Sequence, residues 1–196
     1  MCTHANFYTT NFAYNTNAYS KGKLFLLELG YITGEKNVEK IMLEYYRRWA
    51  FKHPAPDDFV KVAEQVSGMQ LQWYKNYMLN TTKTIDYAID SVWEENGESK
   101  IRLRRIGEMP MPVDLQVTFK DGTAAMHYVP LSLMYGSKKA EDEKQPFTEH
   151  TAWGWMQPTY TLSFKQSLIN ITKIEIDASK RMADMNRRNN VLEIKW

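Results

Sequence analysis

The chain has 196 residues, of which 43% are hydrophobic and 13% are aromatic. This composition is enough for one large domain or two small ones with a proper core, and it excludes a disordered tail. Lysine and arginine together number 25, against 23 aspartate and glutamate residues, which leaves a net charge of +2. So balanced a charge does not predict nucleic acid or an anionic membrane surface as a partner.

Cysteine usage and hydropathy set two further limits. Cys2 is the one cysteine of the sequence, so no internal disulfide is expected to hold the fold. No apolar run approaches the roughly 20 residues of a membrane span. The longest candidate, Leu24–Leu27, ends at Glu28. The first residues lack the basic and apolar regions of a signal peptide. If a longer parent protein is exported, we expect its signal peptide to lie upstream. The cellular compartment is not determined by these features.

The first half of the sequence has the apolar spacing of helices. Residues 19–31 carry apolar side chains on most sides of a helical wheel, which is typical of a helix buried in a larger domain. Gly34 is expected to end this helix. A second helix is predicted by one apolar stripe, made of Val38, Ile41, Met42, Tyr45 and Trp49.

Two shorter helices are expected to follow. Pro54 and Pro56 interrupt the second helix, because proline cannot continue a helix. Asp57 is placed to cap a third helix, and Gly68 is expected to close it. The predicted buried residues are Phe59, Val62, Ala63 and Val66 in the third helix, and Leu71, Tyr74 and Met78 in a fourth.

Near Thr84 the apolar pattern changes from helical spacing to alternation. Asn96-Gly97 is a strong hairpin signal, because a tight hairpin turn needs positive φ angles. The charged stretch 136–149 is expected to be a loop. Alternation predicts strands around Ile85, Tyr87, Ile89 and Trp93; Ile101 and Leu103; Val113, Leu115, Val117 and Phe119; Tyr160, Leu162 and Phe164; and Ile174 and Ile176.

These patterns predict an α+β chain of two domains. Residues 1–82 are expected to form a helical part and residues 83–196 an antiparallel β-sandwich, because several short strands at this spacing are typical of sandwiches. Four helices make a small core for an independent domain, so the helical part is interpreted as the end of a domain that begins upstream.

Motifs for metal binding and nucleophilic catalysis are missing from the sequence. None of the four histidines is followed by glutamate, and no two of them have helical ligand spacing, so no H-E-x-x-H zinc motif exists. There is no nucleophile elbow, P-loop or dinucleotide-binding motif either. The sequence therefore predicts no metal ligand in this chain. His127, in a strand pattern, and His150, in a loop, are interpreted as structural residues.

A series of short motifs supports a more specific hypothesis. The motifs of the first half are Tyr19-Ser20-Lys21-Gly22, a Leu-Gly turn at 29–36, Phe51-Lys52-His53-Pro54, Asp57-Asp58-Phe59 and Ser67-Gly68 with Leu71. Those of the second half are Met109-Pro110-Met111-Pro112-Val113, Asp121-Gly122 and the polar ending 181–190. Their order resembles the aminopeptidase N (gluzincin) family of zinc metallopeptidases, and in particular its bacterial branch.

The resemblance extends over nearly the whole chain and implies the C-terminal fragment of such an enzyme. Residues 1–82 would be the helical C-terminal part of a thermolysin-like catalytic domain, and residues 83–196 a structural β-sandwich. The zinc cofactor, the peptide substrate and the missing N-terminal part of the catalytic domain would belong to the intact parent, for which a periplasmic or exported location is plausible. This chain alone would lack the zinc motif and is expected to be inactive.

The resemblance assigns one catalytic role to this chain. In the family, the tyrosine of the first motif donates a hydrogen bond to the oxyanion of the tetrahedral intermediate, and Tyr19 matches that position. Ser20 stands where the family usually has glutamate, which leaves the phenol chemistry unchanged. Tyr14 would line the same cleft. The alternative for Tyr19 is a packing tyrosine at the start of a helix.

Two rival interpretations come from other functional classes. Trp153, Trp155 and Tyr160 could present aromatic faces to a carbohydrate or a peptide, which would make the second half a binding module. The alternative for both tryptophans is to fill the core. The third interpretation is a non-catalytic scaffold relative, whose exposed apolar first helix docks on a partner or forms a dimer.

Overall fold

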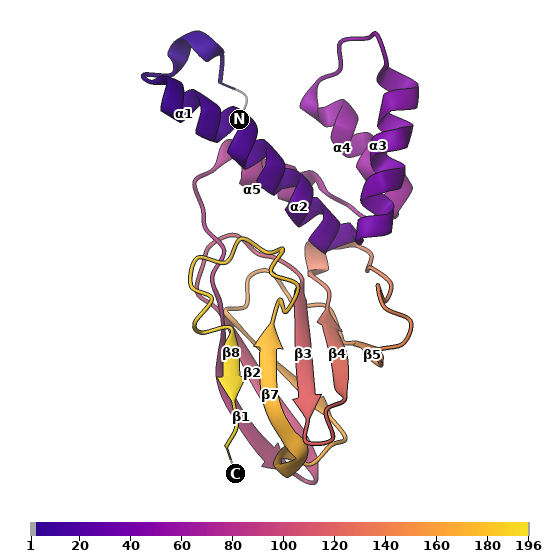
Figure 1. Cartoon of the computed structure of the whole chain (residues 1–196), viewed down its shortest axis with the longest axis vertical. Helices are drawn as coiled ribbons and strands as arrows, with labels where there is room; N and C mark the ends of the chain where they lie inside the picture. Colours follow the sequence, from indigo (N-terminus) through magenta and orange to yellow (C-terminus); the bar gives the residue numbers. More distant parts are fainter. Residues whose placement is uncertain (1–2, 196) are drawn as a thin grey trace. The chain divides into compact units, whose positions relative to one another are not determined.

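The computed structural model describes residues 3–195, and its fold is α+β (Figure 1). This coarse class is the one predicted from the sequence. The chain divides into two compact units. The helical unit consists of Met1–Lys83 and Gly136–Lys139, and the sheet unit consists of Thr84–Tyr135 and Ala140–Trp196. No helix in the described range is long and apolar enough to cross a bilayer.

Glycine residues separate the main helices of the helical unit, as the sequence predicted. Gly34, with φ 92°, ends the second α-helix, and Gly68, with φ 71°, ends the fourth in a left-handed conformation. The elements are η1 (Ala5–Phe7), α1 (Asn11–Asn15), η2 (Thr16–Ser20), α2 (Lys21–Thr33), α3 (Glu35–Trp49), α4 (Pro56–Ser67) and α5 (Gln72–Asn80).

The core of the helical unit forms around the second half of α2. Leu29, Tyr31 and Ile32 are fully buried there, and the Tyr74 ring of α5 stacks on Phe25 with centroids 4.9 Å apart. The Tyr74 hydroxyl donates to the carbonyl oxygen of Phe25 over 2.7 Å, which pairs a buried polar group. The first half of α2 is less buried than the sequence predicted, because Leu26 and Leu27 are exposed.

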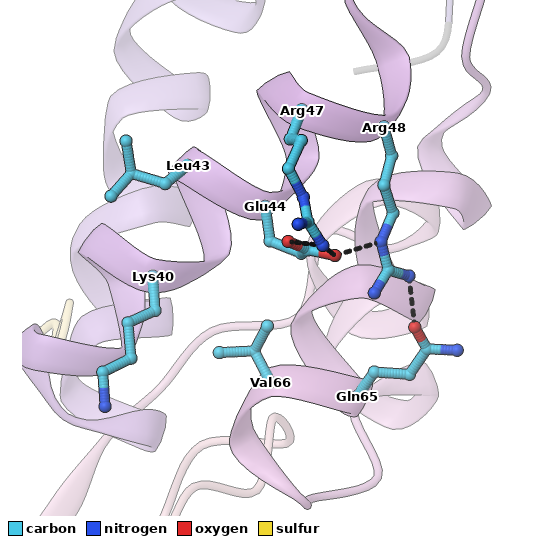
Figure 2. A pocket seen from close by; sticks show the side chains of 7 residues that line it. All are labelled: Lys40, Leu43, Glu44, Arg47, Arg48, Gln65 and Val66. Atoms are coloured by element: carbon cyan, nitrogen blue, oxygen red, sulfur yellow. Dashed lines mark hydrogen bonds and ion pairs between the residues drawn. The ribbon is translucent and has the colours of Figure 1, made fainter.

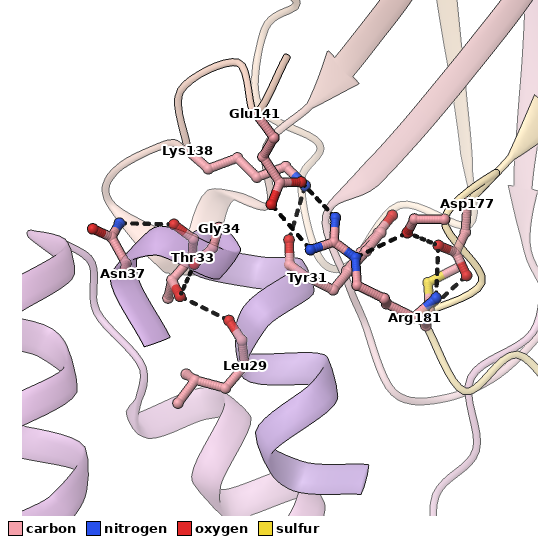
Figure 3. Close-up of polar contacts among 11 residues, drawn as sticks. Leu29, Tyr31, Thr33, Gly34, Asn37, Lys138, Glu141, Asp177 and Arg181 are labelled. Atoms are coloured by element: carbon pink, nitrogen blue, oxygen red, sulfur yellow. Dashed lines mark hydrogen bonds and ion pairs between the residues drawn. The ribbon is translucent and has the colours of Figure 1, made fainter. Parts of the chain in front are cut away.

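The C-terminal end of α2 receives a buried lysine from a distant segment. The Lys138 ammonium donates to the carbonyl oxygen of Tyr31 over 2.9 Å and lies 4.7 Å from the centroid of the Tyr31 ring (Figure 3). A positive charge at this end complements the helix dipole and satisfies a terminal carbonyl. Of the stretch 136–149, expected to be a loop, Gly136–Lys139 therefore belong to the helical unit, whereas Phe147–Glu149 form a short strand of the sheet unit.

The start of α4 differs from its prediction. Asp57 does not cap the helix; Ala55 occupies the capping position, and the Asp58 carboxylate accepts the Ala55 N–H over 2.9 Å. The reason is Pro56, whose fixed φ favours the first helical position and moves the start upstream. Asp57 lies in the first turn and forms an ion pair with Lys75 of α5.

Two separate sheets make up the sheet unit (Figure 1). The first has the order β1-β2-β6, and the second has the order β5-β4-β3-β7-β8. All pairs are antiparallel except β4 with β5. The strands are β1 (Tyr87–Glu95), β2 (Glu98–Arg105), β3 (Val113–Phe119), β4 (Ala124–Val129), β5 (Phe147–Glu149), β6 (Thr159–Phe164), β7 (Ile171–Ile176) and β8 (Val191–Glu193).

The hairpin predicted at Asn96-Gly97 joins β1 to β2. Both residues have positive φ, 53° and 75°, and Glu95 pairs with Glu98 across the turn. In β2, Ile101 and Leu103 are buried and alternate with exposed arginines, as the period of two predicts.

Aromatic contacts join separate elements of the sheet unit. The His127 ring of β4 lies 4.4 Å, centroid to centroid, from the Phe164 ring of β6. Tyr87 of β1 meets Trp153 edge to face at 5.5 Å. The sequence did not predict β5 or β8, because each is three residues long and neither alternates clearly.

Candidate functional site

Tyr19 lies in a π-helical turn immediately before α2. The turn is η2, and the Lys21 N–H at its end bonds to the carbonyl oxygen of Thr16, five residues earlier. Such wide turns are rare and are found frequently at functional sites. The Tyr19 side chain is 67% exposed, so it does not serve to fill the core.

Three tyrosines gather around this turn. The Tyr14 and Tyr19 rings meet edge to face, with centroids 6.3 Å apart and planes at 88°. Tyr8 also meets Tyr14 edge to face, with ring centroids 5.6 Å apart and planes at 76°. Tyr14 lies near the end of α1, and Tyr19 lies in the turn η2 that follows it directly. We call Tyr8, Tyr14 and Tyr19 the tyrosine cluster.

The segment before the cluster has its own local support. The Thr10 hydroxyl accepts the Ala13 N–H over 3.1 Å and so caps α1, the short helix that carries Tyr14. Edge-to-face contacts of this kind add about 0.5–1.5 kcal/mol to the packing of aromatic rings. The ring of Tyr19 is thus held by its neighbour while its hydroxyl can face solvent.

The chemistry open to Tyr19 is hydrogen-bond donation. Among the described residues, none forms a hydrogen bond with its phenol. A phenol in this position can donate its O–H to an anionic oxygen of a ligand, and a fixed donor of this type stabilises charge that develops during a reaction.

A metal centre does not form within residues 3–195. No group of three or more histidine, cysteine, aspartate or glutamate side chains in this range could hold a metal ion. His4 and His53 are exposed, and each lies in a separate segment. The residues present therefore do not fit a zinc site.

The other two histidines meet in the sheet unit. Nδ1 of His127 lies 3.0 Å from Nε2 of His150, so one ring donates a hydrogen bond to the other. Burial, with a contribution from His150, lowers the pKa of His127 to about 4, and burial also lowers the pKa of His150. The two histidines lie in different segments and form no sequence motif, so their contact was not predicted.

The aromatic residues of the rival binding surface have different surroundings. Trp153 is 2% exposed, and its indole N–H donates to the carbonyl oxygen of Gln157 over 3.0 Å. The Tyr160 ring packs on Trp153 at 5.4 Å. Trp155 is 42% exposed. Trp153 therefore packs as a core residue, and the two tryptophans do not share a solvent-facing aromatic surface.

The polar ending of the chain is held by buried carboxylates. Asp177 accepts backbone N–H groups of Arg181 (3.1 Å) and Met182 (2.9 Å), and Arg181 itself pairs with Glu141 (Figure 3). Asp184 accepts the Tyr87 N–H over 2.9 Å and so ties the same segment to β1. These groups bind one another and the backbone, which indicates a structural role.

The helical unit also has an open groove between α3 and α4 (Figure 2). Its volume is about 430 Å³, and its lining consists of Lys40, Leu43, Glu44, Arg47 and Arg48 from α3 with Gln65 and Val66 from α4. No sequence motif marked this surface, because the side chains come from two helices.

Comparison of the chain with protein-family models gives no match, and comparison with curated proteins gives none either.

Proposed function

We propose that this chain is the C-terminal portion of a zinc-dependent aminopeptidase of the aminopeptidase N-like family, which removes N-terminal residues from peptides. The proposal rests on the order of motifs in the sequence and on one structural observation. That observation is the exposed Tyr19, on a π-helical turn and against the ring of Tyr14.

The proposal requires one chemical act of this chain. Hydrolysis of a peptide bond passes through a tetrahedral intermediate in which negative charge accumulates on the former carbonyl oxygen. The Tyr19 phenol donates a hydrogen bond to that oxygen, which is worth about 3–4 kcal/mol for a well-placed donor. Exposure of the ring leaves its hydroxyl accessible, and the edge of Tyr14 limits the positions that the ring can take.

Zinc and its ligands must come from outside this chain. Residues 3–195 have no suitable ligand group, so the proposed activity depends on an upstream part of the polypeptide. In the proposed parent, the helical unit is the end of a thermolysin-like catalytic domain, and the sheet unit is a β-sandwich without catalytic residues. The exposed apolar side chains Leu26, Leu27 and Phe12 in the helical unit favour an additional packing partner.

The test compares two proteins: this chain and a version extended upstream through the catalytic domain. Zinc content is measured by elemental analysis, and hydrolysis by release of p-nitroaniline from alanyl-p-nitroanilide. We expect zinc and hydrolysis in the extended protein and neither in this chain. A folded extended protein with neither would remove the enzyme assignment and leave a non-catalytic relative.

A further inference from the structure

The groove between α3 and α4 has an excess of positive charge. Lys40, Arg47 and Arg48 line it together with a single carboxylate, Glu44 (Figure 2). A second hollow shares Arg48 and Gln65 with the first and adds Lys52, Lys61, Asp58, Trp49 and Val62. The cations of the continuous surface thus outnumber its carboxylates.

Both carboxylates of this surface already have partners. Glu44 accepts from Nη2 of Arg47 over 2.9 Å and from Nε of Arg48 over 2.5 Å, and these hydrogen bonds lower the pKa of Glu44. Asp58 accepts the N–H of Ala55 at the start of α4. The negative groups are therefore occupied by neighbours, and the positive charge that remains faces solvent.

Glu44 also orients the two arginines. It holds the guanidinium groups of Arg47 and Arg48 beside each other, and Arg48 extends across the groove to Gln65 of α4 (Figure 2). Arg47 makes its contact with Glu44 through Nη2, and its side chain is 77% exposed. A guanidinium has five N–H donors in a planar fork that matches a carboxylate, so Arg47 can still bind a second one.

Apolar side chains lie among these cations. Leu43 is 72% exposed on α3, and Tyr46 lies exposed one turn further along the same helix. Val66 contributes an apolar side chain from α4. The inner side of α3 packs through the fully buried Ile41, so the outer apolar residues do not belong to the core of this unit.

From this combination we propose that the α3–α4 groove binds an acidic amphipathic helix of a partner protein. Leucine-type side chains of that helix contact Leu43 and Val66, and its carboxylates pair with Lys40 and Arg47. Binding of this kind is the helix-in-groove mode, with apolar anchors for contact and charges for orientation. Nucleic acid fits less well, because the chain has a net charge of only +2.

The test measures fluorescence anisotropy of a labelled peptide with this chain. The probe is an amphipathic peptide of alternating glutamate and leucine pairs, about twelve residues or three helical turns long. We expect saturable binding that weakens when NaCl rises from about 50 to about 300 mM. The double variant Lys40→Glu with Arg47→Glu should bind the peptide at least about tenfold more weakly than the unchanged chain. Leu43→Ser should also reduce the affinity.

The matched control is Lys23→Glu, an exposed lysine on α2 that does not line the groove. It should bind the peptide as the unchanged chain does, and circular dichroism should show that all variants are folded. The proposal is overturned if Lys23→Glu weakens binding as much as the double variant. It is equally overturned if a glutamate–glutamine peptide without leucine or a DNA duplex binds as well, or if the upstream-extended protein does not bind the probe.

Discussion

His127 and His150 share one hydrogen bond across 3.0 Å, although they are far apart in sequence. The His127 ring also packs against the rings of His150 and Phe164, with centroid distances of 5.2 Å and 4.4 Å. A protonated His127 would have to be desolvated and would lie against another imidazole. This environment explains why the pKa of His127 is lowered to about 4.

This pair predicts that the sheet unit loses stability in mild acid. The unfolded chain binds a proton on His127 near the ordinary pKa of 6.5, whereas the folded chain binds it only near 4. The free energy contributed by the neutral imidazole is therefore fully present above pH 6.5 and falls as the pH decreases toward 4. Urea unfolding should show a loss of about 2 kcal/mol from this group between pH 7.5 and pH 5.

The control for this prediction is another histidine. His127→Asn keeps a polar side chain without a titrating ring and should remove most of the pH dependence over this interval. His53→Asn changes an exposed histidine and should leave the dependence unchanged. Equal pH dependence in the unchanged chain and in His127→Asn would contradict the assignment.

Tyr14 is expected to act as a positioning residue for Tyr19. In the upstream-extended protein, Tyr14→Leu should lower kcat by about three- to tenfold with little change in KM, because an edge-to-face contact contributes about 0.5–1.5 kcal/mol. Tyr14→Phe keeps the ring and should retain near-normal kcat.

An NMR measurement on this chain checks the same role without activity. Nuclear Overhauser effects between the rings at positions 14 and 19 should be present in the unchanged chain and in Tyr14→Phe. A Tyr14→Phe variant as slow as Tyr14→Leu would mean that the Tyr14 hydroxyl, rather than its ring, is what matters.

Local sequence patterns suffice to predict a turn or helix end where the backbone needs a particular residue. Gly34, Gly68 and the Asn96-Gly97 turn lie where the sequence placed them, because each satisfies a local demand for positive φ. Contacts between distant segments have no such signature. Lys138 at the end of α2, the His127–His150 pair and the groove around Arg47 all depend on tertiary placement.

The tyrosine cluster was predicted from the sequence only in part. The motif around Tyr19 could be found in the sequence, and Tyr14 was expected to lie near it. The edge-to-face contact joins the end of α1 to the π-helical turn η2. Nothing in the sequence distinguishes this turn from ordinary helix, and the third ring, Tyr8, was not predicted at all.

Gly107 is predicted to be intolerant of any side chain. A Cβ atom at this position would lie 2.4 Å from the carbonyl oxygen of Thr84 and 2.5 Å from the backbone nitrogen of Asp86. Because backbone atoms cannot move aside cheaply, Gly107→Ala should destabilise the sheet unit by about 2 kcal/mol or more in urea unfolding. Gly154→Ala is the control, since its nearest neighbour is the flexible Gln157 side chain at 3.7 Å. Similar effects of both substitutions would refute the steric explanation.

The Asp177 carboxylate is predicted to hold the polar ending of the chain. It is buried and accepts four hydrogen bonds, from Ser179, Arg181, Met182 and Arg187. Asp177→Ala leaves these donors without an acceptor and should cost about 2–4 kcal/mol of unfolding free energy. Asp142→Ala removes an exposed turn aspartate and should cost less than about 1 kcal/mol. A loss for Asp177→Ala no larger than that for Asp142→Ala would contradict this role.

The central claim is that the Tyr19 phenol stabilises the oxyanion during peptide hydrolysis. Its most direct test is kcat/KM for alanyl-p-nitroanilide in the upstream-extended protein, with Tyr19→Phe compared against Tyr46→Phe. Tyr46 is an exposed tyrosine of the same unit on α3 and serves as the control. The proposal predicts a loss of about 10²- to 10³-fold in kcat/KM, arising from kcat, for Tyr19→Phe alone, with zinc content unchanged. Equal activity of the two variants would contradict the claim.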